Sequence, residues 1–501
     1  MSLMGIDLGS GSCKAVLFSE NGVLLAHANR AYEAHSPRPG WAEMDAECLW
    51  TAVVGVVREV SAHTGGDDVT ALAIAAHGET FIPVDRSGLA VGPAILNSDN
   101  RATDEAAAWD AKFGKDAIYR ITGLPLHAMF AINKIMWLRQ HDPQLFAKAD
   151  RFLSVEDYVL VRMGLPPCID YSMASRTMAF DIRRKEWSEE ILSYAGLRKE
   201  QLGIPVPSGE KVGVLSRPAA AELGLREGVI VATGGHDQPC GALGAGVVRP
   251  GQVADSAGSY ECLAAVSSEP RNTPEALQYA LNSYCHVVPD QYITLAFFPA
   301  GLVTRWFTEQ FCAADEAEAK RTNQTLHDVL AAQVEKSATG PTGLCITPHF
   351  VGACNPHWDV RATGAMTGLT PSITRHHMYK AIFEGIACEL ALNTEVLEKI
   401  VGPFDRVTLH GGNARSAFSV QLRADLTGKT MATLEHSEAV CQGAAMLAGV
   451  AAGIYCDAQE AAAQWVKVNR TYAPNADASE RYAKQVSRYR QLYPALAACR
   501  K

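Results

Sequence analysis

Two aspartates, each beside a glycine-rich turn, are the residues of this chain best placed to do chemistry. The stretch 231–247, VATGGHDQPCGALGAGV, puts Asp237 between a β-branched run and a helix of small residues. Because Asp is a good helix N-cap residue, a purely structural role has to be weighed against a chemical one. A carboxylate in so bare a turn can also accept a proton from an approaching ligand. Taken alone, the stretch leaves both interpretations open.

Asp7 begins the other turn, DLGSGSCK at residues 7–14. Gly9 and Gly11 allow backbone geometry that other residues avoid, and they leave backbone amides uncovered. Polar donors complete the turn: Ser10, Ser12 and Lys14. Such a turn can wrap phosphate oxygens, and a carboxylate at its mouth could hold Mg²⁺ directly or through water. The alternative is a tight hairpin with a satisfied aspartate.

Two further glycine turns lie in the second half of the chain. SAGSYE at 256–261 carries Ser259, and LHGGNARS at 409–416 carries paired glycines that let a flat base or ribose approach the backbone. Two rival phosphate motifs fail. TGKT at 427–430 has Arg423 where a P-loop needs glycine, and the glycines of GALGAG have the wrong spacing for a dinucleotide fingerprint.

The elements that must position these turns alternate between strands and helices. The first forty residues predict three strands, with a hairpin at Glu20–Gly22 because Asn-Gly lies between hydrophobic runs. Residues 46–65 have helical periodicity, residues 69–96 return to strands, and residues 478–501 predict an exposed amphipathic helix. The pattern starts again near Gly251. We expect an α/β architecture of two domains, 1–248 and 249–501.

Composition narrows the function class. The 501 residues exceed what one core usually holds, and the net charge of −9 with no basic block argues against nucleic acid as a partner. Apolar runs of membrane-spanning length are missing from the sequence, and the first residues lack the pattern of a signal peptide. Thirteen scattered cysteines without a CxxC pair favour reduced thiols, so we expect a cytoplasmic protein without a membrane partner.

Taken in order, these turns and the segments between them resemble the FGGY family of carbohydrate kinases, within the sugar kinase, Hsp70 and actin group. The resemblance covers almost the whole chain. Its further segments are GWAEMDAECLW at 40–50, HGETFIPVD at 77–85, TGLPLHAMFAINKIMWLRQHDP at 122–143, DYSMASRTMAFDIRRKEWSEEIL at 170–192 and GAMTGLTPSITRHHMYKAIFE at 364–384. Each is weak alone, and their shared order is what carries the signal.

The resemblance implies two ribonuclease H-like (actin-like ATPase) domains around a central cleft, with sugar mainly on the N-terminal domain and ATP mainly on the C-terminal one. The implied reaction moves the ATP γ-phosphate to a hydroxyl of a sugar or polyol of the pentulose or hexulose class. Asp7 matches the magnesium-linked aspartate and Asp237 the catalytic base. The implied nucleotide contacts are Gly9, Ser10, Gly11, Ser12, Lys14, Gly258, Ser259, Gly301, Arg305, Gly412 and Ser416. A homodimer is one assembly that the resemblance allows.

The implied sugar end centres on Glu79, which matches a family contact to polyol hydroxyls. The other implied substrate positions are His77, Gly78, Asp99, Met129 and Gln238. Gly78 stands where the glycerol kinase branch has Arg, and Met129 where it has Tyr, so we expect a roomier, less polar pocket that suits a larger sugar or polyol than glycerol. Asn97 replaces a Trp typical of the xylulokinase-like branch, which puts xylulose itself in doubt.

Two other functions stay open at this point. An actin- or Hsp70-like ATPase would share the phosphate turns but would not need Glu79 or Asp99. A sugar-binding regulator that has lost catalysis would not need Asp7 and Asp237.

Overall fold

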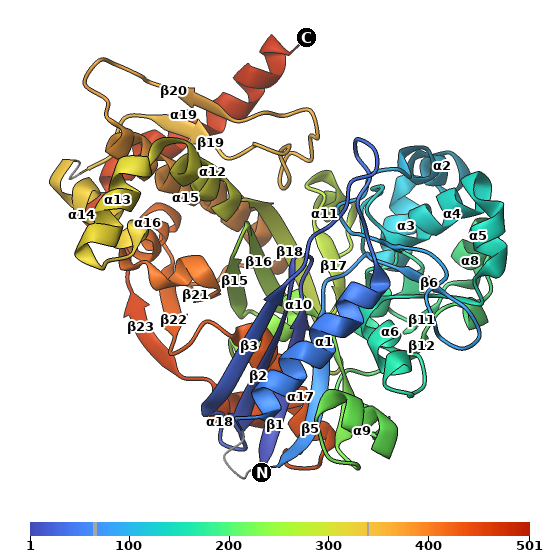
Figure 1. The fold of residues 1–501 in the computed structure, drawn as a ribbon. Helices are drawn as coiled ribbons and strands as arrows, with labels where there is room; N and C mark the ends of the chain where they lie inside the picture. The colour runs from blue at the N-terminus through green and yellow to red at the C-terminus, as the bar shows by residue number, and fades with distance from the viewer. Residues whose placement is uncertain (64–67, 338–339, 501) are drawn as a thin grey trace.

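The computed structural model describes residues 1–63, 68–337 and 340–500, and each half of the chain builds one large mixed sheet (Figure 1). The N-terminal sheet has the order β13-β14-β5-β1-β2-β3. Strands β14, β5 and β1 are parallel to one another, while β1, β2 and β3 form an antiparallel meander. Its bounds are β1 Ser2–Leu8, β2 Ser12–Ser19, β3 Leu24–Ala31, β5 Val69–Ala76, β13 Lys211–Val214 and β14 Ile230–His236.

The C-terminal sheet repeats this arrangement. Its order is β17-β18-β16-β15-β21-β22-β23, with β15, β21 and β22 parallel and β15, β16 and β18 antiparallel. The duplicated meander followed by two parallel strands confirms the expected two-domain α/β fold. Its bounds are β15 Val253–Ala257, β16 Tyr260–Ser267, β17 Asn282–Cys285, β18 Tyr292–Pro299, β21 Arg406–His410, β22 Thr430–Leu434 and β23 Val468–Tyr472.

Two helices of small residues, α10 (Asp237–Gly244) and α17 (Ala439–Ala451), pack against each other in the centre of the molecule (Figure 1). A Cβ on Gly244 would lie 1.9 Å from the carbonyl oxygen of Ala439, and one on Gly443 would lie 2.0 Å from that of Cys240. Larger residues at these two glycines would push the helices apart. This close approach explains why the helix after Asp237 consists mostly of small residues.

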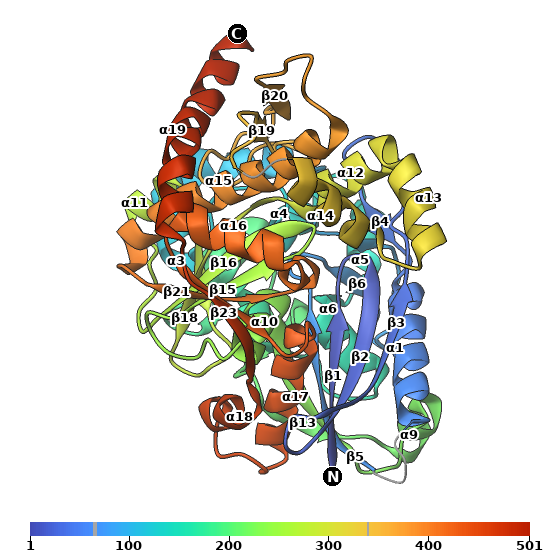
Figure 2. The same ribbon diagram turned by 90° about the vertical axis from the view of Figure 1, so that its left-hand side faces the viewer.

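The second half of the chain also completes the core of the first. Helix α17 packs on β1, β5 and β14. Leu3, Phe18 and Ala73 of the N-terminal sheet share one hydrophobic cluster with Met446 of α17 and Trp465 of α18 (Ala458–Trp465). Figure 2 shows α17 and α18 beside the N-terminal strands. The two sequence halves are therefore interlocked.

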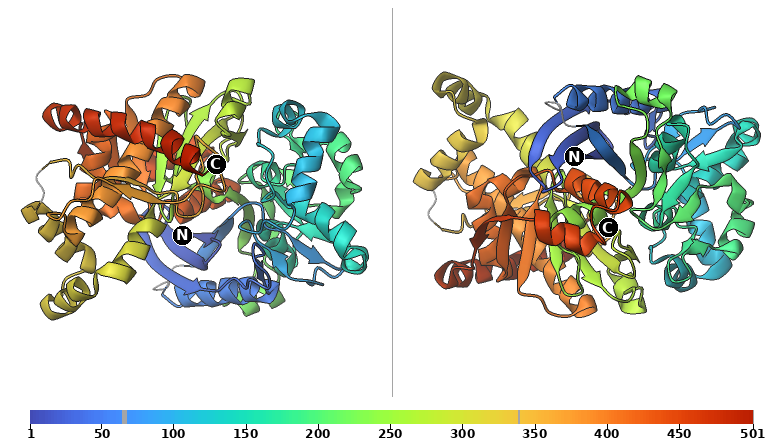
Figure 3. Two further views of the ribbon diagram at one scale, coloured as in Figure 1. Left: turned by 90° about the horizontal axis from the view of Figure 1, so that it is seen from above. Right: turned by 90° about the horizontal axis from the view of Figure 1, so that it is seen from below.

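The remaining helices cover the sheets and build a lobe on the outer side of the N-terminal half, where α2, α3, α4, α5 and α8 gather away from the C-terminal sheet (Figure 3). Bounds here are α1 Ala46–Ser61, α2 Thr103–Phe113, α3 Lys115–Thr122, α4 Ala131–His141, α5 Pro143–Lys148, α6 Val155–Arg162, α7 Tyr171–Ser175, α8 Glu189–Ala195, α9 Arg217–Leu223, α11 Pro274–Gln278, α12 Gly301–Phe311, α13 Ala313–Thr322, α14 Leu326–Ser337, α15 Arg375–Val401, α16 Ala417–Thr427 and α19 Ala476–Cys499. Short two-stranded sheets are formed by β4 Glu43–Met44 with β7 Ala94–Ile95, β6 Ile82–Val84 with β8 Arg151–Leu153, β9 Cys168–Asp170 with β12 Ile204–Val206, β10 Phe180–Asp181 with β11 Glu186–Trp187, and β19 Cys345–Thr347 with β20 Ala365–Thr367.

Most expected elements are present. The three N-terminal strands, the hairpin turn with Gly22 at φ +77°, helix α1 and the amphipathic C-terminal helix α19 are confirmed. The predicted helix 46–65 ends at Ser61, and residues 64–65 and 501 of the two predicted helices lie outside the described residues. The rejected TGKT motif is the end of α16 and the start of β22. The thirteen cysteines are all free thiols. Within the described ranges, the helices are too short or too polar to cross a bilayer.

Candidate active site

Three carboxylates lie at the same edge of the N-terminal sheet. Strands β1, β5 and β14 are parallel neighbours, and Leu8 and His236 both pair in register with Ala76. The carboxyl ends of parallel strands lie at the same edge of a sheet, which is where α/β proteins place ligands. Asp7 lies near the end of β1, while Glu79 follows β5 and Asp237 follows β14. The structure therefore brings together residues that are separated by up to 230 positions in the sequence.

Asp237 is the first residue of α10 and not its cap. His236 holds the N-cap position, and no side chain caps this helix end. The Asp237 carboxylate is thus not consumed by helix capping, which was the structural alternative. Its side chain is 24% exposed, but Oδ1 is buried and accepts no hydrogen bond, although Nε2 of His236 lies 3.2 Å away.

Burial changes the acidity of two of these groups. Burial raises the pKa of Asp237 from 3.8 to about 7, and the nearby charges of Asp7 and Glu79 add to this effect. Burial also raises the pKa of Asp7 to about 6, although the Lys14 ammonium acts in the opposite direction. Ionisable groups with raised pKa values in a charged cluster are typical of functional sites.

Arg176, just after α7, pairs with Glu79. Its Nε donates to Oε1 of Glu79 at 2.5 Å, and its Nη1 donates to Oδ1 of Asn282 on β17 at 3.0 Å. A Cβ on Gly78 would lie 2.9 Å from Cγ of Arg176 and 3.0 Å from Cδ2 of His236. The glycine thus leaves room for the arginine. The expectation of a less polar pocket is wrong on this point, because a guanidinium reaches Glu79 from another element.

Two expected substrate residues are already bonded to the scaffold. Nδ1 of His77 lies 2.8 Å from the carbonyl oxygen of Leu8, and its Nε2 lies 2.8 Å from Oγ1 of Thr80. Asp99 is fully buried and accepts from Arg101 Nε at 2.9 Å and from Ala42 N at 2.6 Å. Either residue would have to give up these bonds to hold a substrate. Their substrate roles stay predictions that this geometry does not favour.

Met129 and Gln238 are both half-buried. Met129 lies in the turn before α4, where its N–H donates to Nδ1 of His127 at 3.2 Å. The His127 ring meets the edge of Trp358, from the C-terminal half, with ring centroids 5.5 Å apart. These positions agree with a pocket wall, and their contact with a substrate stays a prediction.

The turn after β1 joins the two halves. Lys14 on β2 donates from Nζ to Oε2 of Glu438, the residue before α17, at 2.6 Å. Ser10 and Gly11 are exposed, and a Cβ on Gly11 would meet nothing within 4 Å. The other turn positions, Gly9 and Ser12, are half-buried. The backbone of this turn is open to a ligand, while its lysine is engaged by a carboxylate.

The glycine turns of the C-terminal half assemble into one cluster. The Gly301 N–H donates to the Gly258 carbonyl at 3.1 Å, and Asn413 Nδ2 donates to the same carbonyl at 3.3 Å. A Cβ on Gly301 would lie 2.5 Å from that oxygen, and one on Gly411 would lie 3.0 Å from the Ala257 carbonyl. Three segments far apart in the sequence therefore form one surface made mostly of backbone.

Helix α10 connects this cluster to the carboxylates. One turn after Asp237, a Cβ on Gly241 would lie 2.7 Å from Cε1 of His410, the last residue of β21. Of the other predicted nucleotide contacts, Ser259 and Gly412 lie in the cluster's turns, and Arg305 is exposed on α12. Ser416 is the N-cap of α16, and its Oγ accepts from Ser419 N at 3.4 Å. Nucleotide contact by these residues stays a prediction.

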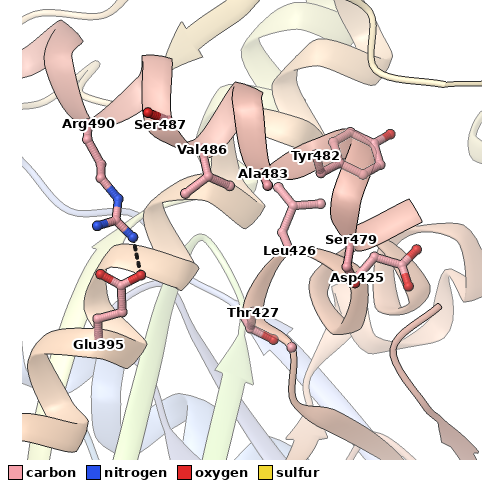
Figure 4. A pocket seen from close by; sticks show the side chains of 11 residues that line it. Glu395, Asp425, Leu426, Thr427, Ser479, Tyr482, Ala483, Val486, Ser487 and Arg490 are labelled. Carbon is pink, nitrogen blue, oxygen red and sulfur yellow. Dashed lines mark hydrogen bonds and ion pairs between the residues drawn. The ribbon is translucent and has the colours of Figure 1, made fainter. Parts of the chain in front are cut away.

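A hollow of about 400 Å³ lies elsewhere, between α15, α16 and α19 of the C-terminal half (Figure 4). The Glu395–Arg490 ion pair spans one side of it, and Leu426, Tyr482 and Val486 line it. None of the predicted site residues borders it. We therefore do not assign the predicted chemistry to this hollow.

Sequence reasoning missed two residues of the site, Arg176 and Tyr284. Arg176 lies inside a segment that the resemblance used, but its partner Glu79 is 97 residues away. Tyr284 on β17 places its hydroxyl 2.8 Å from Nδ1 of His236, which is 48 residues away. No local pattern indicates such pairings.

Comparison with known proteins matches both halves. The model of the FGGY family of carbohydrate kinases, N-terminal domain, matches residues 2–244, and that of the C-terminal domain matches residues 253–452. The chain belongs to the FGGY family of carbohydrate kinases. It is a sugar kinase, a phosphotransferase with an alcohol group as acceptor, and kinases of this family use ATP as a substrate.

The curated relatives of this sugar kinase carry several substrate names. The chain is 28% identical to a xylulose kinase of Bacillus subtilis over 98% of this chain and 96% of the relative. It is 26% identical to a gluconokinase of the same species, over 96% and 93%, and 28% identical to an autoinducer-2 kinase of an Enterobacter species, over 98% and 94%. Among solved structures, a xylulose kinase of Rhodospirillum rubrum superimposes with a TM-score of 0.86 at 25% identity, with 99% of each chain covered.

Proposed function

We propose that this kinase transfers the γ-phosphoryl group of ATP to a hydroxyl of a neutral ketose or polyol, with Asp237 as the base. The observation that carries the proposal is the position of Asp237 beside Asp7 and Glu79, where burial and their charges raise its pKa to about 7. A general base works best when its pKa lies near the working pH. A free surface aspartate would be a much weaker base at neutral pH.

The rest of the reaction needs positioning more than covalent chemistry. A sugar hydroxyl held by Glu79 would present its proton to Asp237 while its oxygen approaches the terminal phosphorus of ATP. The exposed backbone at Ser10 and Gly11 can offer amides to phosphate oxygens. In the glycine cluster the Gly258 and Gly301 N–H groups already donate to backbone carbonyls, so the exposed backbone at Gly412 is the part of it that a ligand can approach. We infer that ATP lies across these two surfaces, which α10 connects.

The residues present fit a magnesium ion that arrives with the nucleotide. Within the described ranges, three or more His, Cys, Asp or Glu side chains never gather as a metal-binding group. Mg²⁺ commonly binds through one or two carboxylates together with substrate phosphates, so Asp7 near the exposed turn suits this mode. The ion would neutralise charge on the phosphoryl oxygens.

The charges around the sugar end favour a neutral substrate. Arg176 is paired with Glu79, and Arg101 is paired with Asp99 and Glu43. An aldonate such as gluconate would call for an unpaired cation, and these two cations are already engaged. The third cation near Glu79, Lys134, donates to the Leu96 carbonyl at 2.7 Å, and burial lowers its pKa to about 7, so its positive charge is weakened at neutral pH. Glu79 with its arginine suits instead a pair of adjacent hydroxyls, one accepting from the guanidinium and one donating to the carboxylate.

A coupled assay that measures ADP release over a substrate panel tests the proposal. The panel contains pentuloses, hexuloses, polyols and gluconate, with Asp237→Asn as the inactive control. We expect turnover of a neutral ketose or polyol and none of gluconate. Gluconate as the preferred substrate would overturn the substrate class. ATP hydrolysis that ignores every sugar would indicate an ATPase, and sugar binding without turnover would indicate a regulator.

A further inference from the structure

His236 stands between the predicted base and a tyrosine of the other half of the chain. Its Nε2 lies 3.2 Å from Oδ1 of Asp237, and its Nδ1 lies 2.8 Å from the hydroxyl of Tyr284 on β17. The His236 backbone N–H donates to Oγ of Ser172 at 2.8 Å, which fixes the main chain at this point. His236 and Tyr284 are both buried, so neither group exchanges these partners for water.

The burial of the tyrosine hydroxyl favours one tautomer of the histidine. The Tyr284 side chain is fully buried, and among the described residues Nδ1 of His236 is the hydrogen-bond partner of its hydroxyl. A buried hydroxyl proton without an acceptor costs free energy, so the hydroxyl donates to Nδ1. A neutral imidazole then carries its own proton on Nε2, the nitrogen that faces Asp237.

We propose that Tyr284 and His236 form a positioning pair that directs an Nε2–H at Oδ1 of Asp237 and leaves the other carboxylate oxygen for the acceptor hydroxyl. This inference rests on the proposed role of Asp237 as the base. Oδ1 is buried and accepts no hydrogen bond, so it is an acceptor in need of a donor. A small rotation of either side chain turns the 3.2 Å contact into that bond.

The charges around Asp237 determine how much an Nε2–H donor from His236 changes the acidity of this carboxylate. Asp7 and Glu79 both disfavour a negative charge on Asp237, while the backbone N–H of Gln238 and the charge of Arg176 favour it. Burial, with Arg176 and His77 adding to the effect, keeps the pKa of His236 well below its usual value, so the imidazole stays neutral. The ionisable groups that face the pair are Asp7 from β1, His77 and Glu79 after β5, Arg176 after α7, Cys262 from β16 and Tyr284 from β17.

The variant Tyr284→Phe removes the hydroxyl and keeps the ring. Without it, the His236 proton can move to Nδ1, and the lone pair of Nε2 then faces the carboxylate. We expect kcat to fall about tenfold, the value of one hydrogen bond, with KM within about twofold. We also expect the acid limb of the kcat/KM profile to move to higher pH, because Asp237 then holds its proton more tightly.

Tyr119→Phe is the matched control, since this buried hydroxyl donates to the Leu281 carbonyl at 2.8 Å beside the same strand. It should lose similar stability and leave the pH profile in place. A Tyr284→Phe profile that is unmoved, or moved to lower pH, would overturn the proposal. The direction of the shift is decisive. If the Tyr284 hydroxyl instead accepted a hydrogen bond from Nδ1, its removal would move the kcat/KM profile to lower pH.

A readout that needs no substrate separates this inference from the proposed function. In protein labelled with ¹⁵N-histidine, the ring nitrogen shifts of wild-type His236 report its tautomer, and His236→Gln identifies the resonances. A proton on Nε2 supports the pair even if every sugar in the panel fails. A proton on Nδ1 refutes the pair even if the enzyme is an active sugar kinase.

Discussion

Arg176 occupies the space beside Glu79 that a side chain at position 78 would need, and its Nε lies 2.5 Å from Oε1 of Glu79. The guanidinium also lies over the ring of Tyr284, with its Cζ 4.9 Å from the ring centroid. A buried carboxylate close to Asp237 is tolerated here because a buried cation faces it. The glycine before Glu79 and the arginine after α7 are thus two parts of one arrangement.

Gly78→Ala tests this arrangement. The new methyl group would lie within 3.0 Å of Cγ and Cβ of Arg176, atoms close to the backbone that cannot move aside easily. We expect KM for the sugar to rise about tenfold while ADP affinity measured by calorimetry stays the same. Gly340→Ala is the control, because a Cβ there meets nothing within 4 Å. An unchanged KM would show that Arg176 does not hold Glu79 for the substrate.

Asp237→Asn tests the base. The amide is nearly isosteric with the carboxylate but cannot take a proton, so kcat should fall roughly 10²- to 10⁴-fold. Affinity for Mg-ADP should stay within about twofold, since the predicted nucleotide contacts lie elsewhere. Steady-state kinetics and calorimetry check the two parts. A fall in kcat of roughly threefold or less, which the loss of a minor contact could cause, would exclude Asp237 as the base.

The pH dependence of kcat/KM follows from the raised pKa of Asp237, about 7. The base is active only when it is unprotonated, so activity should be lost as the pH falls through this value. We expect kcat/KM to rise between pH 5.5 and 8 with a midpoint about 7, and then to level off. Initial rates in buffers of constant ionic strength measure it. A midpoint about 4, the ordinary range of a carboxyl, would show that burial does not raise the pKa of Asp237.

The same raised pKa predicts that the ionised form of Asp237, which is the active base, lowers the stability of the folded protein. Because the folded-state pKa of Asp237 is raised from 3.8 to about 7, the folded protein binds this proton more tightly than the unfolded chain does. Its contribution to stability is therefore lost as the pH rises from about 4 to about 7 and stays lost above. We expect Asp237→Asn to melt at a higher temperature than wild type at pH 8 and at a similar one at pH 4.5.

Thermal melting in the presence of a magnesium chelator makes this comparison, with the exposed Asp116→Asn as the control. A difference in melting temperature that is the same at both pH values would show that the Asp237 charge is not the cause.

Glu438→Gln separates two roles of Lys14. The lysine was predicted to meet phosphate, and in the structure its Nζ lies 2.6 Å from Oε2 of Glu438. If the carboxylate competes with phosphate for this ammonium, its neutralisation should raise ADP affinity several-fold, in line with a pair worth about 1 kcal/mol. Lys14→Met should lower the affinity. An unchanged affinity in both variants, with a lower melting temperature, would leave Lys14 with a purely structural role.

The sequence predicted those features that depend on local patterns. The meander of β1, β2 and β3, helix α1 and the glycine turns follow from alternation, periodicity and turn residues that lie close together in the chain. The resemblance then singled out Asp7, Glu79 and Asp237, which the register of three parallel strands places at one edge. Pairings across many elements, such as Arg176 with Glu79, leave no periodic trace, so they needed the folded structure.

The hydrogen bonds that Asp99 accepts from its neighbours show what a family match cannot predict. A family match identifies a residue type at a position, but it does not say whether neighbours already use its oxygens. Arg101 does so here, and its guanidinium also lies 3.8 Å from the centroid of the Trp41 ring. Residue identity alone could not separate this clamp from a substrate contact.

The cluster that joins Leu3 and Phe18 to Met446 and Trp465 bears on how the chain matures during synthesis. The first strands leave the ribosome early, yet the apolar face they present to α17 finds its cover only after some 440 further residues have been translated. Until then this apolar face is exposed, and we expect a chaperone to bind it. A ribosome-bound chain that stops before α17 should remain protease-sensitive in its N-terminal sheet, and release of the full chain should make that sheet resistant.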